Sequence, residues 1–376
     1  MPAVNRRAFF TRYTLGGLTA ALPTSTSEAA AQGAPSAPTA GQSDPAAARQ
    51  RLQAMLDGAA ITQLVYVVAR ARIADHVGDE AARAEDLASA AGLHADALYR
   101  VMRALAGYGV FQELDGRRFR QSAISHLLRT DAPHSMRAAA AVRGEDFFWR
   151  SWGALRESVR TGRTGHEIVY GENTFDWFAK NPDAARLFDD FQAALTTAST
   201  TAITKAYPMP SGAIVADIGG GNGTLISAVL EANPSARGVL FDLPHVVEAA
   251  RPRLAPLANR IVLTGGDFFK AVPTGANVYI MKYILHDWEE PKALTILANT
   301  RKAMPPRSVL LVIEDLVCGP NAPCRAKLGD VTMLARTGGR NMTETEYRTL
   351  LQGAGFSVSR VIPVDGDLHI IESRAA

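Results

Sequence analysis

The apolar segment YIMKYIL, residues 279–285, runs directly into His286, Asp287 and Trp288. A segment of this kind either ends a buried strand at the surface or presents a catalytic group at the mouth of a site. Because the imidazole of histidine titrates near neutral pH, His286 is the candidate general base. We expect Asp287 and Trp288 to fix the turn after the strand.

Three aspartates also end apolar segments, in AIVADIG (Asp217), LFDLPH (Asp242) and GGDFF (Asp267). The carboxyl ends of parallel strands meet at one edge of an open α/β sheet, so these carboxylates should line one groove. Asp242 lies about 20 residues beyond a glycine-rich turn, where a carboxylate can accept from both ribose hydroxyls. Asp267 could accept from an exocyclic amine, with Phe268 against the ring.

The glycine-rich turn DIGGGNGTL follows the first of these segments and opens a helix. Gly219 and Gly221 let the backbone approach a ligand closely, but Thr224 stands where a dinucleotide site has its third glycine. No Gly-Lys-Ser/Thr follows, which excludes a phosphate-binding P-loop. A ligand with a ribose, an adenine, a positive charge and no phosphates fits this groove, and S-adenosylmethionine is such a ligand.

Alternating strands and helices are predicted from Pro210 onward to hold these residues. Fully apolar strands separated by helices predict a mostly parallel sheet covered on both faces, an α/β fold. The last segment, FSVSRVIPVDGDLHIIESR, contains two strand candidates joined through Asp365 and Gly366. We expect it to form an antiparallel hairpin at one edge of the sheet.

The first part of the chain predicts a different kind of domain. Aliphatic residues between Ala46 and His76 recur at helical spacing on both faces, which favours a helix covered on more than one side by a partner chain. Residues 83–122 show a winged-helix pattern of two helices and two short strands. That pattern raises DNA binding as an alternative, but its basic residues (Arg100, Arg103, Arg117, Arg118 and Arg120) form only a modest patch. A structural or dimerisation role is favoured.

The segment between these parts, residues 144–206, is predicted to be helical and lined with aromatic residues such as those of TFDWFAKNPDAARLFDDF. Such a stripe suits a protein core as well as a ligand pocket, so it does not decide the function.

Composition sets outer limits. The 376 residues are 47% apolar and 20% charged with a formal charge of +3, values of a globular protein with no global demand for nucleic acid or an anionic membrane. No apolar run approaches the ~18 or more residues that would suggest a membrane span. Cys318 and Cys324 lack a nearby histidine and are taken as ordinary thiols, with a disulfide as the alternative for an exported protein.

The N-terminus contains Arg6-Arg7 before Phe9-Phe10, a short apolar segment and a stretch of small residues. This pattern resembles a twin-arginine export signal, and residues 24–48 resemble a disordered linker. The alternative is a leader with two adjacent arginines by chance. Because S-adenosylmethionine is made in the cytoplasm, the cytoplasm is the expected location and export is the alternative.

Five motifs then follow in a familiar order: VADIGGGNGTL, FDLPHVVEAA, GGDFF, MKYILHDWEEP and FSVSRVIPV. With them the chain resembles, from about Ala46 to Arg374, the metal-independent S-adenosylmethionine-dependent O-methyltransferases of plant phenolics, acetylserotonin and bacterial natural products. The resemblance implies a Rossmann-like methyltransferase domain behind a winged-helix dimerisation domain. It divides the chain into a leader and linker (1–45), a dimerisation domain (46–143), and a helical substrate segment with the methyltransferase domain (144–376).

The resemblance also implies roles for individual residues. His286 would be the general base, and Glu314 in VIEDLV would orient it. Cofactor contacts would come from the glycine turn and strand ends (Asp217, Gly219, Gly221, Asp242, Leu243, Asp267, Phe268 and Lys282). Substrate contacts would come from Phe148, Leu187, Phe191, Leu195 and Met333, and the partner from a second copy of the chain. No metal, nucleic acid or membrane is expected.

One position departs from the family pattern. The family often has an acidic residue in GG-x-E-R-T, where this chain has GGRNMT with Asn341 and Met342. Asn341 could accept a hydrogen bond from the imidazole but could not neutralise imidazolium, so His286 would be a weaker base.

A small-molecule O-methyltransferase acting on an aromatic or polyketide-like hydroxyl is the leading hypothesis. An N- or C-methyltransferase, or a decarboxylase-like relative without base catalysis, is the alternative, and a DNA-binding regulator is a third.

Overall fold

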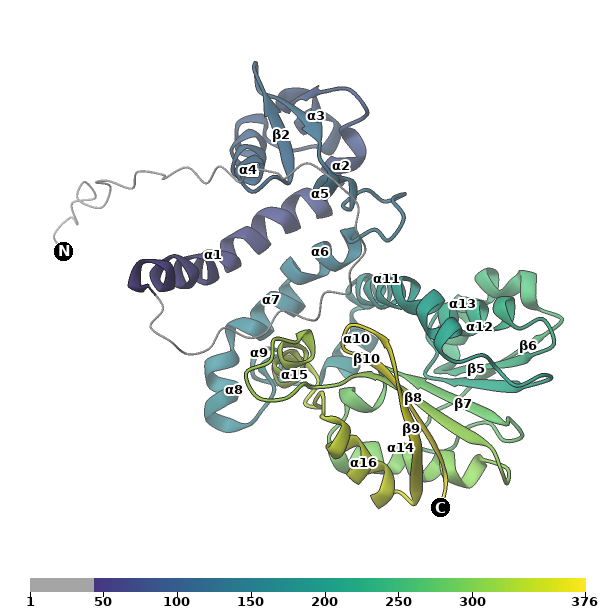
Figure 1. The fold of residues 1–376 in the computed structure, drawn as a ribbon. Helices are drawn as coiled ribbons and strands as arrows, with labels where there is room; N and C mark the ends of the chain where they lie inside the picture. The colour runs from purple at the N-terminus through teal and green to yellow at the C-terminus, as the bar shows by residue number, and fades with distance from the viewer. Residues whose placement is uncertain (1–43) are drawn as a thin grey trace, which may run out of the picture. The chain divides into compact units, whose positions relative to one another are not determined.

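A seven-stranded mixed sheet forms the centre of the larger part of the protein in the computed structural model, which describes residues 44–376 (Figure 1). Its strand order is β6-β5-β4-β7-β8-β10-β9. The strands are β4 (Ile214–Ile218), β5 (Arg237–Asp242), β6 (Ile261–Gly265), β7 (Val278–Lys282), β8 (Val309–Asp315), β9 (Phe356–Asp365) and β10 (Leu368–Ala375). Strands β4 to β8 pair in parallel, and β10 runs antiparallel to both β8 and β9. The predicted parallel sheet and C-terminal hairpin are confirmed.

Helices cover both faces of this sheet, as its apolar strands require. The helices on its faces are α11 (Pro182–Ala206), α12 (Thr224–Ala232), α13 (Pro244–Leu254), α14 (Glu290–Ala303) and α16 (Glu344–Gly353). Helix α15 (Arg325–Arg336) packs instead against the short helices within residues 146–170. One core packs α11, α12 and α13 against one face, and a second packs α14 and α16 against the other (Figure 1). Residues of β4 alternate between the two cores, Val215 facing the first and Ala216 the second. This burial holds the carboxyl ends of the strands in fixed register.

The N-terminal part contains the predicted winged helix. Its elements are α1 (Pro45–Arg70), α2 (Ile73–His76), β1 (Ala82–Arg83), α3 (Ala84–Ala91), α4 (Ala95–Gly107), β2 (Phe111–Leu114), β3 (Arg118–Gln121), α5 (Ala123–His126) and α6 (Arg137–Gly144). The strands form a three-stranded sheet in the order β1-β3-β2. The single helix expected from Ala46 to His76 breaks after Arg70, because Arg72 adopts a left-handed conformation with φ of 54°.

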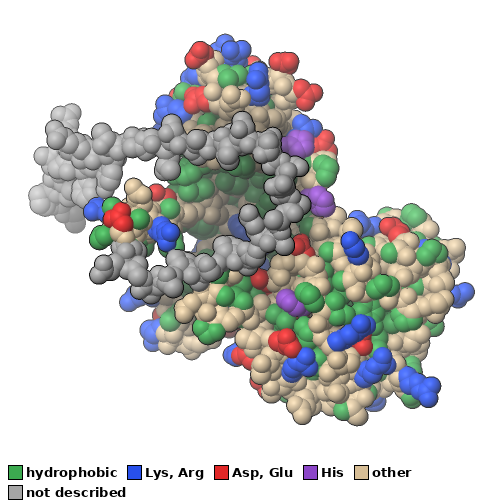
Figure 2. All heavy atoms as spheres, viewed as in Figure 1, with side chains coloured by type: hydrophobic (Ala, Val, Ile, Leu, Met, Phe, Trp, Pro, Cys, Tyr) green, Lys and Arg blue, Asp and Glu red, His purple; other side chains and the backbone are tan. Residues whose placement is uncertain are grey.

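One cation of the wing, Arg117, lies beside carboxylates. Arg117 pairs with Asp96 at 2.9 Å and with Glu85 at 3.4 Å. On the face drawn in Figure 2, basic side chains of the winged helix alternate with acidic ones. Pairing makes Arg117 less available to neutralise a phosphate, whereas Arg118 and Arg120 have no ion pair among the described residues.

Helix α1 differs from expectation in one respect. Among the helices of residues 44–376, it is long and apolar enough by length and composition to cross a membrane. No apolar run in the sequence predicts this, because glutamine, aspartate, glycine and threonine residues interrupt the apolar residues of the helix. Its C-terminal end belongs to a protein core, where Val68 and Ala69 are buried, while Leu52, Met55 and Leu56 are exposed.

Short helices connect the two parts. They are α7 (Asp146–Gly153), α8 (Leu155–Thr161), α9 (Gly165–Tyr170) and α10 (Thr174–Lys180). The predicted domain boundary at residues 143/144 falls at the end of α6, which packs against both α1 and α11. The predicted leader, apart from its last two residues, lies outside the described residues.

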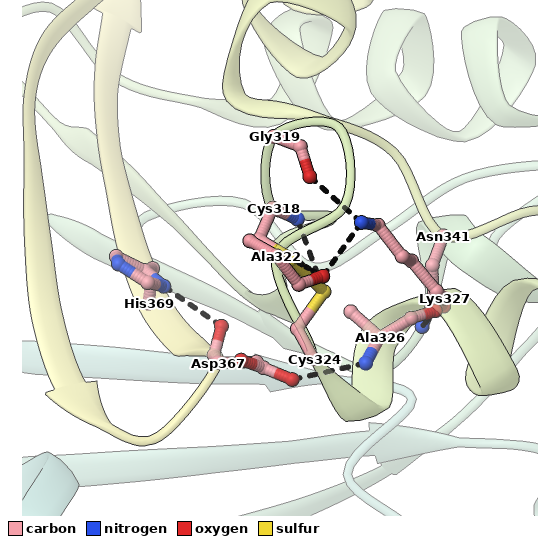
Figure 3. Close-up of a disulfide and its surroundings, with 9 residues drawn as sticks. All are labelled: Cys318, Gly319, Ala322, Cys324, Ala326, Lys327, Asn341, Asp367 and His369. Carbon is pink, nitrogen blue, oxygen red and sulfur yellow. Dashed lines mark hydrogen bonds between the residues drawn. A yellow bond between two sulfur atoms is a disulfide. The ribbon is translucent and has the colours of Figure 1, made fainter. Parts of the chain in front are cut away.

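The two cysteines form a disulfide, Cys318–Cys324, which corrects their assignment as ordinary thiols (Figure 3). The bridge closes the loop between β8 and α15. Lys327 donates from the first turn of α15 to the carbonyls of Gly319 and Ala322, and the amide of Ala326 donates to Asp367. The separation of the two cysteines by six residues allows this direct bridge once the loop folds back on itself.

Candidate active site

His286 stands on a tight turn beyond the fourth parallel strand. Strand β7 ends at Lys282, Tyr283 takes a left-handed φ of 55°, and residues Leu285–Asp287 form one 3₁₀ turn. A non-glycine residue in this conformation is held there by its surroundings, and such residues cluster at functional sites. The turn directs His286 into the protein, where it is only 8% exposed.

Glu314 lies next to the imidazole, as the family resemblance implied. Its Oε2 is 2.8 Å from His286 Nδ1, and its Oε1 accepts from the His286 backbone amide at 3.4 Å. The ring N–H does not point straight at Oε2, so the contact is a close ion pair with an off-line hydrogen bond. Because Glu314 is fully buried at the end of β8, its charge acts on the ring with little screening.

Asp287 supplies a second carboxylate to the same imidazole. Its Oδ1 lies 3.8 Å from Nε2, on the side of the ring opposite Glu314. Burial by itself lowers the pKa of His286, but the charge and contact of Glu314, and then the charges of Asp287 and Asp315, raise it to about 9. The sequence predicts only a turn-fixing role for Asp287 and a single acidic neighbour, Glu314, for His286. The structure corrects that count.

Tyr283 completes the surroundings of the base. Its ring stacks on the imidazole with centroids 5.2 Å apart and planes 16° apart, and its hydroxyl donates to Asp315 Oδ1 at 3.0 Å. Burial and the nearby carboxylates raise the pKa of Tyr283 well above its usual value, so the phenol stays neutral. No sequence signal singled out this residue, apart from its place three positions before the histidine.

The loop after α15 presses on the catalytic turn at Gly339. A Cβ added there would lie 2.0 Å from the carbonyl oxygen of His286 and 2.5 Å from the amide nitrogen of Trp288. No other residue type fits that space without moving the turn. Contact with the loop at Gly339 therefore fixes the position of the backbone that carries His286.

Asn341 lies two residues farther along this loop, but its side chain turns toward α15. Its Nδ2 donates to the carbonyl of Ala326 at 3.2 Å, and its Oδ1 is buried without a hydrogen-bond partner. Within residues 44–376 the Asn341 side chain makes no hydrogen bond to the imidazole, and its predicted catalytic role stays a prediction.

The predicted cofactor residues meet at the carboxyl edge of β4 and β5. Asp242 accepts at both oxygens, from the amide of Gly221 at 2.8 Å and from the amide of Leu243 at 2.7 Å. Gly219 and Gly221 have φ values of 70° and 57°, which allow the sharp turn. A Cβ on Gly219 would meet the side chain of Ile284 at 2.5 Å, so this glycine also keeps the groove open next to the His286 turn.

Asp217 and Lys282 lie below this groove. Burial, together with the charge of Asp242, raises the pKa of Asp217 to about 7, and the Asp217 Oδ2 has no partner. Burial lowers the pKa of Lys282 to about 8 against the opposing charges of Glu314, Asp315 and Asp217. The Lys282 Nζ donates to Thr196 of α11 at 3.2 Å. A buried acid and a buried amine with displaced pKa values at one groove are typical of a functional site.

Asp267 and Phe268 lie beyond β6. The amide of Phe269 donates to Asp267 Oδ1 at 2.9 Å, and Lys270 lies 3.6 Å from Oδ2, so Asp267 shapes its own turn. The Phe268 ring is edge-on to Trp288, with centroids 6.0 Å apart. An added Cβ on Gly219 would lie 3.6 Å from Phe268, which places this ring at the same groove.

The predicted substrate residues come from three helices: Phe148 from α7, Leu187, Phe191 and Leu195 from α11, and Met333 from α15. Phe191 lies beside Phe188, which stacks on Phe178 with centroids 5.1 Å apart. Thr337 donates from its hydroxyl to the Met333 sulfur at 3.4 Å. The contact of these five residues with substrate stays a prediction.

Arg336 was not predicted from the sequence as a residue of this segment. It lies over the rings of Phe148 and Phe188.

The groups gathered at this groove suit an organic cofactor. Within residues 44–376, no three His, Cys, Asp or Glu side chains are grouped closely enough to hold an ion. The groove offers amide dipoles, the buried carboxylate of Asp217, the partly buried carboxylate of Asp242 and the ring of Phe268. These groups fit a ribose, a base and a cationic centre, as S-adenosylmethionine would present.

Two family models match the chain. An O-methyltransferase domain covers residues 152–357, and an O-methyltransferase dimerisation domain covers residues 53–131. The chain is 39% identical to phenazine O-methyltransferase PhzM of Lysobacter antibioticus, over 85% of this chain and 94% of that one. It is 32% identical to phenazine-1-carboxylate N-methyltransferase of Pseudomonas aeruginosa, over 88% of this chain and 98% of that one.

Solved structures agree with these matches. The crystal structure of LaPhzM has a TM-score of 0.84 and 39% identity, and the match covers 88% of this chain and 99% of that one. NcsB1, an O-methyltransferase from neocarzinostatin biosynthesis solved with S-adenosylmethionine and 2-hydroxy-5-methyl naphthoic acid, has a TM-score of 0.73 and 29% identity, over 84% of this chain and 96% of that one. The chain belongs to the S-adenosylmethionine-dependent O-methyltransferase family, with an N-terminal dimerisation domain of that family.

Proposed function

We propose that the protein transfers a methyl group from S-adenosylmethionine to a hydroxyl of a small aromatic molecule, with His286 as the general base. The observation that carries the proposal is the position of His286 between the carboxylates of Glu314 and Asp287, at the strand edge that also holds Asp242. The imidazole is thus oriented, and its protonated form is stabilised, next to the groove for the cofactor.

The residues divide the work of methyl transfer. When bound, S-adenosylmethionine supplies an electrophilic methyl on a sulfonium whose leaving group is a neutral thioether. The Nε2 of His286 accepts the proton of the acceptor hydroxyl, while Glu314 at Nδ1 stabilises the imidazolium that forms. The aromatic rings of α7 and α11 hold the acceptor in line, which by itself removes a large part of the barrier. General bases of this kind contribute about 10²–10⁴-fold.

Relatives support an aromatic acceptor. The Lysobacter relative is named for a phenazine and NcsB1 was solved with a hydroxynaphthoic acid. One relative of similar identity is named as an N-methyltransferase. Nitrogen acceptors need less help from a base, so N-methylation is the second candidate.

Replacing the base separates the two candidates. For His286→Ala we expect methyl transfer to a phenolic acceptor to fall by about 10²–10⁴-fold, with S-adenosylhomocysteine affinity unchanged. The acceptor is found by mass spectrometry after incubating the enzyme and labelled S-adenosylmethionine with an extract of its own cells. His76→Ala is the control, because His76 is exposed and distant in the chain from the site. Full turnover by His286→Ala with bound cofactor would refute base catalysis.

We further propose a homodimer formed through the N-terminal domain. The match to the family's dimerisation domain and the exposed apolar residues of α1 support it.

Two features bear on the location of the protein. S-adenosylmethionine is made in the cytoplasm, which favours the cytoplasm, whereas the disulfide between Cys318 and Cys324 favours an oxidising compartment and hence export. N-terminal sequencing of the native protein distinguishes a retained leader from a cleaved one.

A further inference from the structure

Arg336 is a buried cation among aromatic rings. It is the last residue of α15 and is only 3% exposed. Its guanidinium lies 4.7 Å from the ring centre of Phe188 and 5.0 Å from that of Phe148. The rings of Phe147 and Phe178 are also within 6.0 Å. The aromatic stripe of the helical segment thus encloses a charge that its apolar composition did not predict.

This guanidinium has hydrogen-bond donors without acceptors. The Nε and Nη2 atoms are buried and have no partner. Ring faces attract a cation but do not accept its N–H groups in the plane where a carboxylate would. Burial lowers the pKa of Arg336 only to about 10, so the group remains charged at neutral pH. A buried, charged and unsatisfied donor set is costly unless a ligand completes it.

Arg336 lies close to the reacting end of the site. The next residue, Thr337, bonds to the predicted substrate contact Met333, and its hydroxyl also acts on Asp287. Asp287 is the carboxylate 3.8 Å from the Nε2 of His286, and the charge of Arg336 acts on it as well. Glu314 and Asp287 are both ion-paired with His286, whereas the guanidinium of Arg336 has no ion pair among the described residues. A carboxylate at Arg336 would therefore have to come from a ligand.

A second unsatisfied group belongs to the same aromatic cluster. His166 of α9 is fully buried, its Nδ1 lies 3.3 Å from the Ser151 hydroxyl, and its Nε2 has no partner. Burial and the charge of Arg336 keep this imidazole neutral, with a pKa of about 4. The Ser151 hydroxyl donates its one proton to the carbonyl of Phe147 at 2.7 Å, so His166 Nδ1 carries the ring proton and Nε2 is a buried acceptor without a partner. The unsatisfied donors of this cluster are therefore those of Arg336.

We propose that Arg336 binds a carboxylate of the methyl acceptor, which makes the acceptor an aromatic hydroxy acid and not a neutral phenol. The planar fork of arginine matches the two oxygens of a carboxylate, and the surrounding phenylalanine rings suit the aromatic body of such an acid. This inference rests on the proposed function, because it assigns the specificity of the same site.

Binding of acids and their esters tests the assignment without requiring turnover. The probes are 4-hydroxybenzoate and 3-hydroxy-2-naphthoate, each with its methyl ester, titrated calorimetrically into the full chain at pH 7.5 with S-adenosylhomocysteine present. For the wild type we expect at least one acid to bind about 10-fold or more tightly than its ester, the range of a charge-assisted bidentate contact. For Arg336→Met we expect that preference to disappear while ester affinity stays within about twofold of wild type.

Two variants guard against a purely structural explanation. Arg336→Lys keeps the charge and loses the fork, so part of the preference should remain. Arg340→Met removes an exposed cation four residues away and should leave the preference intact. Melting temperatures are recorded for each. If Arg336→Met does not fold, the comparison of Arg336→Lys with wild type decides the question.

The proposal is overturned if neither acid binds more tightly than its ester to the wild type, or if the folded Arg336 variants keep the full preference. Its failure differs from failure of the proposed function. Equal methylation of acid and ester, both lost in His286→Ala, would refute the role of Arg336 alone. A preference for acids that depends on Arg336, without methyl transfer to any hydroxyl, would refute O-methylation alone.

Discussion

The ionisation of His286 is governed by the carboxylates around it. Burial alone would lower the pKa of the imidazole, but Glu314, Asp287 and Asp315 raise it to about 9. At neutral pH the free enzyme therefore holds the base mainly in its protonated form. The base that accepts a proton is the neutral form, so its population increases as the pH rises toward 9.

Removing Glu314 should move this titration. In the free enzyme we expect kcat/KM to rise with pH to a midpoint near 9, and Glu314→Gln should lower the midpoint by about 1–3 units because an opposite charge has this effect. The variant should also lose about 10–100-fold in maximal rate as the ring loses its orientation. The measurement is the pH profile of kcat/KM with saturating cofactor. An unchanged midpoint would contradict the role given to Glu314.

The same shift links stability to pH. A histidine whose folded pKa exceeds its unfolded value of about 6.5 stabilises the protein fully below that value, and the contribution is lost as the pH rises through about 9. The free energy of unfolding, measured with urea, should therefore decrease between pH 6 and pH 9.5. This decrease should be larger for the wild type than for Glu314→Gln.

The turns and loops at the strand ends position the site as much as the strands do. The turn after β7 carries His286, and the loop between α15 and α16 lies against its backbone at Gly339. Two segments more than 50 residues apart in the chain thus share one contact.

Gly339→Ala should damage this contact. The added Cβ would lie 2.0 Å from the carbonyl oxygen of His286, so the turn has to move. We expect a loss of about 1–3 kcal/mol in stability, as for overpacked sites, and a fall in kcat larger than any change in cofactor affinity. Gly353→Ala in α16 is the matched control, because its Cβ would meet only Leu294 at 3.8 Å. It should be neutral or slightly stabilising, since alanine favours a helix. Equal activity of the two variants would disprove a positioning role for Gly339.

At the level of the assembled protein, α1 carries the exposed apolar surface. Leu52, Met55 and Leu56 are 57%, 75% and 66% exposed in a helix that lies within the matched dimerisation domain for most of its length. The burial of such residues is favourable by about 1.5–3 kcal/mol each. A second copy of the chain is the partner that the family match supplies.

Polar substitution of this surface should dissociate the dimer. The combined variant Leu52→Gln, Met55→Gln and Leu56→Gln should shift the mass measured by light scattering from two chains to one at micromolar concentration. Val159→Gln, at an equally exposed position on α8, should leave the mass unchanged. A wild-type protein that is a monomer throughout would refute the dimer, and a variant that remains a dimer would place the interface elsewhere.

The local sequence determined the sheet, the hairpin, the winged helix and the edge of the sheet where the cofactor residues gather. Apolar runs, glycine turns and helical periodicity depend on residues close in the chain, and they were enough to predict β7 and the aspartates at the ends of β4 and β5. The resemblance to a family added Glu314. The predicted disulfide alternative was left open because pairing depends on how the loop between β8 and α15 closes.

Tertiary packing alone decided the chemistry around the base. The approach of Asp287 to Nε2, the stacking of Tyr283 on the imidazole and the turn of Asn341 toward Ala326 depend on side-chain directions within one crowded turn. Arg336 looked like an ordinary charge at the end of a helix, and only the packing of α7, α10 and α11 around it made it a buried cation. Sequence spacing places residues on elements, whereas burial and the charges brought together from distant elements set their pKa values and their partners.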